Sequence, residues 1–197
     1  MTDSAAPTTR VWLKDVIIAY APSIFTPRAA KPGNKEKYGA AFLMDPGHPG
    51  LKTISDLVVQ VAKAKWPQNW EARVKELKAG DRLPVHNGDG KASSAGYAGR
   101  FYLNAGNAIR PMVLDRDKTP LTAVDGRPYS GAFVNAYVEI WAQDNQHGKR
   151  INASLLGVQF VRDGERLGGG GVATADDFEA LPSDDGGEQV SPEALFD

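Results

Sequence analysis

Apolar residues recur along the chain at two different spacings, and these spacings predict which segments are strands and which are helices. Runs rich in β-branched and aromatic residues, separated by glycine and proline, are typical of strands. The six predicted strands are Arg10–Tyr20, Tyr38–Met44, Arg100–Ala105, Arg110–Leu114, Ala132–Trp141 and Ile151–Arg162. The pairs Asp125-Gly126 and Asp163-Gly164 supply turns between or after the later strands.

One segment has the spacing of an amphipathic helix. In 51–66, Leu51, Ile54, Leu57, Val58 and Val61 follow the i, i+3, i+4 pattern, and a proline at position 67 ends it. The segment 71–78 is compatible with a short second helix. Few strands, one inserted helix and long loops predict a mainly β fold, a small barrel.

The strand 132–141 has one apolar face and one mixed face. Phe133, Tyr137 and Trp141 alternate with Asn135 and Glu139 on the mixed face. Such a face on an exposed sheet can stack nucleobases, at about 1–3 kcal/mol per base. The same pattern is compatible with a second core layer under the helix or the long loops.

A related mixed face occurs on the strand 100–105. There Arg100, Tyr102 and Asn104 alternate with apolar residues. The two faces together predict a platform made of aromatic rings, side-chain amides and one basic side chain.

Charge is divided unevenly along the chain, and this favours nucleic-acid binding over packing as the role of the rings. Residues 175–197 carry eight acids and no base. Residues 1–174 carry 16 acids and all 23 bases, a net charge of +7, although the whole chain has a net charge of −1. A basic body with an acidic tail is typical of a nucleic-acid binder with an interaction tail.

Composition divides the chain and excludes several classes of site. We expect a disordered lead-in at 1–9, one domain at 10–167, and a glycine hinge with the acidic tail at 168–197. The chain has no cysteine, and its three histidines lack metal-ligand spacing, so no metal and no cofactor are predicted. Neither a secretory signal nor a 20-residue apolar run is present, which predicts a cytoplasmic protein without a membrane span.

Several segments together resemble the single-stranded DNA-binding proteins of tailed phages, the helix-destabilising type of coliphages. The matching segments are Gly96–Tyr102, Tyr129–Tyr137, Gly157–Gly170 and the acidic tail, in which Phe196 precedes Asp197. The resemblance implies an OB-fold-like small barrel with one inserted α-helix and a disordered acidic tail. It also implies a non-enzymatic protein that binds single-stranded DNA without sequence preference in replication, recombination or repair.

The same resemblance implies partners. The tail would recruit replication proteins, such as a DNA polymerase or a helicase-primase, and would compete with DNA for the basic surface. A homodimer is compatible with this picture. A phage-encoded protein of this kind would work in the cytoplasm of the bacterial host.

Three sets of residues are candidates for contacts with DNA and with a partner protein. For base stacking they are Tyr102, Phe133, Tyr137 and Trp141, with Tyr97 and Trp12 in addition. For phosphate contacts they are Lys35, Lys37, Lys91, Arg100, Lys149 and Arg150. For partner binding they are Asp176, Asp177, Glu179, Asp184, Asp185, Glu188, Glu193 and Phe196.

Two other functions fit parts of the pattern. Val113–Thr119 matches the signature of phosphatases with an aspartate nucleophile, with Asp115 as nucleophile and Asp117 handling the proton. That chemistry needs a parallel α/β sheet, so a charged hairpin loop is the favoured interpretation. The second alternative is an adaptor, whose ring face binds a peptide and whose basic surface binds an acidic partner.

Overall fold

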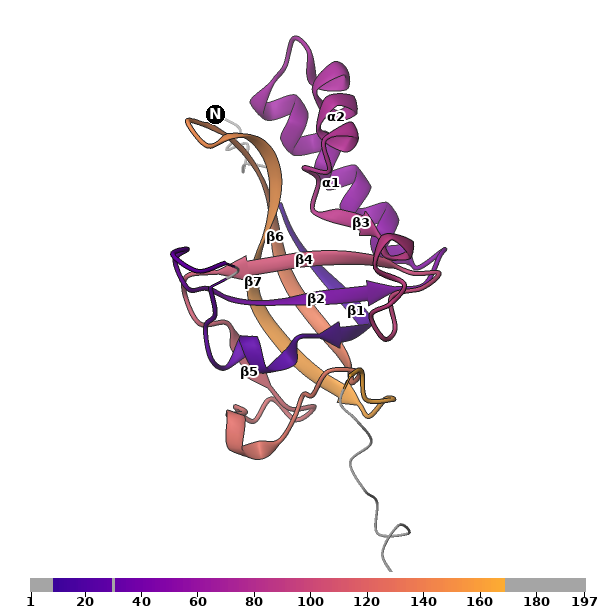
Figure 1. Cartoon of the computed structure of the whole chain (residues 1–197), viewed down its shortest axis with the longest axis vertical. Coiled ribbons are helices and arrows are strands. Elements are labelled where there is room, and N and C mark those ends of the chain that lie inside the picture. Colours follow the sequence, from indigo (N-terminus) through magenta and orange to yellow (C-terminus); the bar gives the residue numbers. More distant parts are fainter. Residues whose placement is uncertain (1–8, 30, 169–197) are drawn as a thin grey trace, which may run out of the picture.

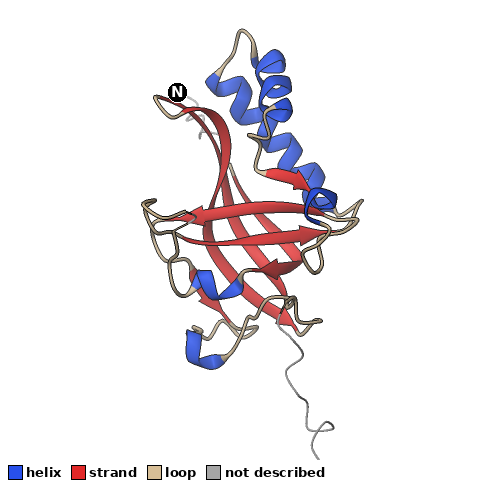
Figure 2. Cartoon of the chain, viewed as in Figure 1, coloured by secondary structure: helices blue, strands red, loops and turns tan. Residues whose placement is uncertain are grey.

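The computed structural model describes residues 9–29 and 31–168 of the chain (Figure 1). Its sheet contains seven strands and is accompanied by two α-helices and three short 3-10 helices (Figure 2). The strands are β1 (Arg10–Ala19), β2 (Tyr38–Met44), β3 (Val85–Asn87), β4 (Phe101–Asn107), β5 (Met112–Leu114), β6 (Phe133–Asn145) and β7 (Gly148–Arg162). The helices are α1 (Pro49–Lys65), α2 (Trp70–Ala79), η1 (Ala21–Ile24), η2 (Gly88–Lys91) and η3 (Ala123–Asp125).

The seven strands are hydrogen-bonded in the order β3-β4-β2-β1-β6-β7-β5. All neighbours are antiparallel except β5 and β7, which are parallel. The sheet curls, so that β2 and β4 cross the direction of β6 and β7 (Figure 1). The curl brings β4 to β7, where the Asn107 side-chain amide donates a hydrogen bond of 3.2 Å to the Leu155 carbonyl oxygen.

The predicted barrel is corrected in one respect. The edge strands β3 and β5 do not pair with each other, so no continuous ladder closes the sheet. The parallel edge strand β5 is only three residues long, and it takes the place on β7 that a closing partner would occupy.

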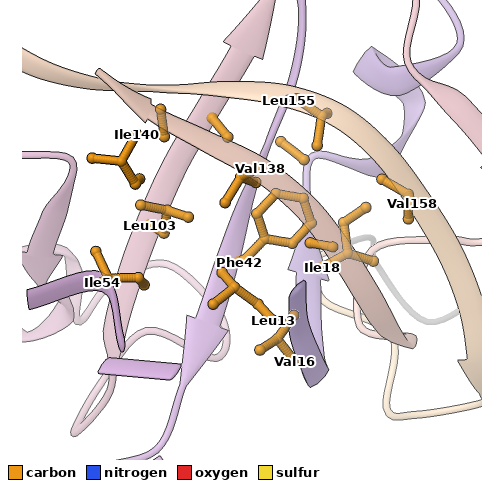
Figure 3. Close-up of a cluster of buried hydrophobic side chains, with 14 of the residues drawn as sticks. Leu13, Val16, Ile18, Phe42, Ile54, Leu103, Val138, Ile140, Leu155 and Val158 are labelled. Atoms are coloured by element: carbon orange, nitrogen blue, oxygen red, sulfur yellow. The ribbon is translucent and has the colours of Figure 1, made fainter. Parts of the chain in front are cut away.

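The interior of the curled sheet is filled by alternating residues of the long strands. On β6, Val134, Ala136, Val138 and Ile140 are all fully buried, which confirms the predicted inner face. The ring of Phe42, from β2, lies in the middle of these side chains (Figure 3). No polar or charged residue is buried among those that the structure describes, so apolar burial provides the driving force for this core.

The predicted helix is confirmed as α1. The segment 71–78, compatible with a second helix, forms α2 after a short turn, so the described residues contain two α-helices rather than the one inserted helix that was expected. The buried side of α1 carries Ile54, Val58 and Val61. At its end the Trp66 indole N–H donates a hydrogen bond of 2.7 Å to the Asp144 carboxylate on β6. The helix is therefore held against the far end of the β6–β7 hairpin. No helix among the described residues has the length and apolar character needed to cross a membrane.

The hairpin formed by β6 and β7 is longer than the sequence pattern predicts. The two strands pair from Phe133 and Arg162 out to Asn145 and Gly148. Residues 143–150 are polar on both faces, because this end of the hairpin projects beyond the core and has no apolar face to bury. The predicted strand at 110–114 is shorter in the structure, and forms only the three residues of β5.

The core makes a direct prediction for stability. Replacing the fully buried Phe42 by alanine should lower the free energy of unfolding by about 3–5 kcal/mol, because it leaves a cavity in the main core cluster. Urea unfolding followed by tryptophan fluorescence measures the change. Val124→Ala is the control, since Val124 is 93% exposed and its truncation should change stability by less than about 0.5 kcal/mol.

Candidate nucleic-acid interface

The outer face of β1, β6 and β7 carries a stacked pair of aromatic rings. The register between β1 and β6 places Trp12 directly opposite Tyr137. Their ring centroids are 4.6 Å apart, and the ring planes meet at 21°. Trp12 is 50% exposed, so part of this pair is open to solvent. The structure thus brings together two of the predicted stacking residues, Trp12 and Tyr137.

Two further predicted rings lie on the same face of β6. Trp141 is 40% exposed, and its indole N–H donates a hydrogen bond of 2.9 Å to the Ser154 hydroxyl on β7. Phe133 lies at the other end of the strand, with the guanidinium carbon of Arg162 3.3 Å from the centroid of its ring. A guanidinium plane can itself stack on a base, so Arg162 adds to the platform.

Polar groups lie between the rings. The Asn135 amide donates to the Gln159 side-chain oxygen at 3.2 Å, across β6 and β7. Arg10 forms an ion pair of 3.4 Å with Glu139, next to the Trp12 position. Arg162 pairs with Asp15 at 3.0 Å. The face therefore combines rings, amides and guanidinium groups, the side chains that contact bases and phosphates.

Tyr97 and Tyr102 do not lie on an exposed face, contrary to the prediction. They are 2% and 6% exposed and form a small second core with Leu43 and two alanines. The connection between β3 and β4, which includes Tyr97, covers the outer side of β2 and β4 at this point. In this structure both rings pack against neighbouring side chains instead of facing solvent.

The ring of Tyr102 has neighbours on several sides. His86 stacks on it at 5.1 Å, and Tyr97 meets it edge-on at 5.0 Å. The Lys91 ammonium lies 4.8 Å from its centroid. A nucleobase could reach this ring only after one of these groups had moved.

The Tyr97 hydroxyl is buried and has no hydrogen-bond partner among the described residues. Burial raises the pKa of this phenol well above its usual value, and the neighbouring Tyr20 phenol raises it further. Tyr97 is thus kept in its neutral form.

The six predicted phosphate contacts do not form one cluster. Lys35 and Lys37 are exposed on the connection between β1 and β2. Lys91 lies on the connection between β3 and β4, and Lys149 and Arg150 lie at the start of β7, beside the hairpin turn. Lys149 is 4.0 Å from the Asp144 carboxylate.

Arg100 is bound within the protein itself. Its Nε donates to the Asp45 carboxylate at 2.7 Å, and its Nη1 donates to the Gly96 carbonyl oxygen at 3.0 Å. These bonds hold the connection between β3 and β4 against the end of β2.

The aspartates of the phosphatase-like signature lie in a turn. Asp115 pairs with Arg127 at 3.1 Å, and the Asp117 carboxylate accepts the Thr119 backbone N–H at 2.9 Å. Hydrogen bonds from Thr119 lower the pKa of Asp117. The signature follows a three-residue edge strand rather than a central parallel strand, so the charged-loop interpretation is favoured. No group of three His, Asp or Glu side chains in the described part of the chain could hold a metal ion.

Sequence reasoning missed Arg162, Arg10 and the contact between Trp12 and Tyr137. Only the pairing register could have identified them, because the members of each pair are far apart in sequence. The predicted tail residues lie outside the described residues; they are Asp176, Asp177, Glu179, Asp184, Asp185, Glu188, Glu193 and Phe196.

The chain is similar in sequence to known proteins. Residues 9–189 match the family model described as Enterobacter phage Enc34, ssDNA-binding protein. Protein p50 of Acyrthosiphon pisum secondary endosymbiont phage 1 is 40% identical over 175 residues, which cover 87% of this chain and 94% of that protein.

Three solved structures have a similar fold. The C-terminal truncation of the bacteriophage Enc34 single-stranded DNA-binding protein is 25% identical, with a TM-score of 0.64, and the match covers 80% of this chain and 88% of that one. The Enc34 protein in complex with ssDNA is 24% identical, with a TM-score of 0.68 and coverage of 81% and 90%. The bacteriophage T7 protein gp2.5, a single-stranded DNA-binding protein, is 16% identical, with a TM-score of 0.50 and coverage of 92% and 98%.

The buried Tyr97 phenol predicts a pH dependence of stability. The pKa of this phenol is raised in the folded state. Its contribution to the free energy of unfolding is therefore fully present below the unfolded pKa of about 10 and is lost as the pH rises above that pKa. Tyr97→Phe should leave stability at neutral pH unchanged or higher, since the hydroxyl has no partner, and should reduce the loss at alkaline pH.

Urea unfolding at about pH 8 and about pH 11, on either side of the unfolded pKa, measures both effects. Equal alkaline losses in the two proteins would contradict a buried neutral phenol at this position.

Proposed function

Because the chain belongs to the family of the Enterobacter phage Enc34 single-stranded DNA-binding protein, we propose that it binds single-stranded DNA without sequence preference, in replication, recombination or repair. The observation that carries this proposal is the exposed stack of Trp12 and Tyr137 on the outer face of the sheet. Membership in this family of binding proteins agrees with the prediction that the chain is not an enzyme.

The stacking set of the proposal is Trp12, Phe133, Tyr137 and Trp141. Every nucleobase has a π-face, so a row of exposed rings binds bases of any sequence. Arg10 and Arg162 lie beside the rings and supply positive charge close to the phosphates of a bound strand. Their ion pairs with carboxylates would have to loosen or be shared with the phosphates.

We further propose that β1, β2, β4, β6 and β7 form an OB-type core. OB folds are five-stranded, partly open barrels that bind oligonucleotides with the loops between strands 1 and 2 and between strands 4 and 5. In this chain those loops are 20–37 and 146–147. Lys35 and Lys37 lie on the first loop, and Lys149 and Arg150 follow the second, which supports their proposed role as phosphate contacts.

A second surface is a candidate for the same function. OB folds also use the outer face of strands 2 and 3, which here are β2 and β4. That face carries the exposed Asn104, with Lys91 nearby over the ring of Tyr102. Lys91→Ala therefore serves as the variant that distinguishes this surface from the Trp12–Tyr137 face.

The acidic tail is proposed to have two roles. It carries eight acids against a body of net charge +7, so it can occupy a surface that binds phosphates. The aromatic Phe196 beside these acids would give a replication protein, such as a polymerase or helicase-primase, an apolar anchor. A homodimer and a location in the bacterial host cytoplasm are part of the same proposal.

The central test is titration of the tryptophan fluorescence with oligo-dT and with a duplex of equal length. We expect quenching by the single strand and little response to the duplex. Tyr137→Ala should weaken oligo-dT binding by about 1–3 kcal/mol, the value of one base–aromatic stack. Val124→Ala changes an exposed apolar residue on the 115–132 connection between β5 and β6, and this variant should bind as the wild type does.

Two results would redirect the proposal. If Lys91→Ala weakens oligo-dT binding and Tyr137→Ala does not, the binding site lies on β2 and β4. No response of the wild type to either nucleic acid would favour the peptide-binding adaptor.

The tail makes its own prediction. Deleting residues 175–197 should tighten oligo-dT binding at low salt, because the competing acids are removed, and the difference should shrink as salt screens them. For both proteins the logarithm of the affinity should fall with the logarithm of the salt concentration, by about 0.7 per phosphate neutralised. Fluorescence titrations between about 50 and 500 mM salt measure both slopes. Unchanged or weaker binding by the truncated chain would contradict competition by the tail.

A further inference from the structure

Four residues on four different strands form one row across the outer face of the sheet. Trp12 on β1 is paired with Tyr137 on β6, and Tyr137 is paired with Gly157 on β7. Gly157 is paired in turn with Met112 on β5. The row therefore contains two rings, a position without a side chain, and a thioether.

The spacing of the two rings shows how they are oriented. Their centroids are 4.6 Å apart, close to the separation of about 4.8 Å between neighbouring strands. Rings stacked at this distance across a strand pair have their planes turned toward the adjacent strands. One face of the Tyr137 ring is therefore against Trp12, and the other is turned toward β7, where Gly157 follows.

Gly157 places no side chain between Tyr137 and Met112, and it is itself buried, so a ligand reaches this gap only when the neighbouring side chains move apart. A Cβ added to it would be 3.9 Å from the Tyr137 Cβ and 4.0 Å from the Met112 Cβ, so a side chain here would stand midway between them. Its φ is not in the left-handed region, and the backbone conformation therefore does not require glycine. A glycine inside a strand often marks a place where a ligand approaches closely.

The local strand geometry and the far side of the gap support a binding role. At this point β7 contains a bulge, with Leu156 as the additional residue, and bulges are frequent beside functional sites. Met112, on the far side of this position, is 66% exposed. Its unbranched thioether can adjust its conformation and makes favourable contacts with aromatic rings.

We infer that movement of the exposed Met112 side chain opens the gap over Gly157 to one nucleobase of single-stranded DNA, which continues the stack from Trp12 and Tyr137 and is covered on its other face by Met112. This inference rests on the proposed function. The bound strand would then cross β1, β6, β7 and β5, rather than run along one strand. A base in a duplex is already paired and stacked, and removing it costs several kcal/mol, so the slot favours single strands.

Filling the gap tests the slot. Gly157→Val should weaken binding of oligo-dT by about 5- to 150-fold, which corresponds to loss of one base–aromatic stack. Binding of an oligonucleotide of equal length made only of abasic residues should stay within about twofold of the wild type, because it has no base to enter the gap. Fluorescence titrations at one salt concentration compare the two ligands.

A second variant keeps the test independent of folding. The Met112 carbonyl oxygen would be 3.3 Å from the new Cβ at position 157, so the valine requires a small shift of β5. Met112→Ala changes only an exposed side chain and should weaken oligo-dT binding by about 2- to 10-fold, again with no effect on the abasic strand. Val124→Ala is the matched control, and thermal unfolding verifies that each variant is folded.

The possible outcomes separate the slot from the proposed function. If folded Gly157→Val and Met112→Ala proteins bind oligo-dT as tightly as the wild type, the slot is overturned, even where Tyr137→Ala binds weakly. If Gly157→Val does not fold, the result for Met112→Ala alone decides. If the wild type does not bind oligo-dT, the proposed function fails first.

Discussion

The pairing register between β1 and β6 is the constraint on which both the core and the candidate interface depend. The same register places Leu13 beside Ala136 on the inner face and Trp12 beside Tyr137 on the outer face. A slip of one residue would turn the rings inward and the apolar residues toward water. Because Leu13 and Ala136 are both fully buried, the cost of exposing them holds the stacked rings in place.

A bulge in β1 keeps apolar side chains on the inner face along the whole strand. The register shifts between Leu13 and Val16, where Asp15 adopts a left-handed conformation. The Asp15 backbone N–H is satisfied by the Asn135 side-chain oxygen at 3.0 Å. The shift allows both halves of the strand to direct apolar residues into the core, although the spacing between Leu13 and Val16 departs from simple alternation.

Covering elements determine which aromatic residues can serve as a binding surface. Tyr102 and Tyr137 lie on the same curled sheet and have similar neighbours in sequence. The connection that carries Tyr97 lies over Tyr102, whereas none of the described connections covers Trp12, which is 50% exposed. A ring that is covered contributes to stability, and a ring that remains open can contribute to binding.

Local patterns in the sequence determined the inner face of β6, the position of α1 and the uneven distribution of charge. Alternation, helical spacing and charge are properties of neighbouring residues, so they can be recognised without knowing what packs against them. Only the tertiary structure decided four other features. They are the row from Trp12 to Met112, the contact of Arg162 with the Phe133 ring, the burial of Tyr102 and the open edge of the sheet. Each of these features depends on which distant segments pair and which loops cover them, and the energy that selects such pairings is shared among residues far apart in the chain.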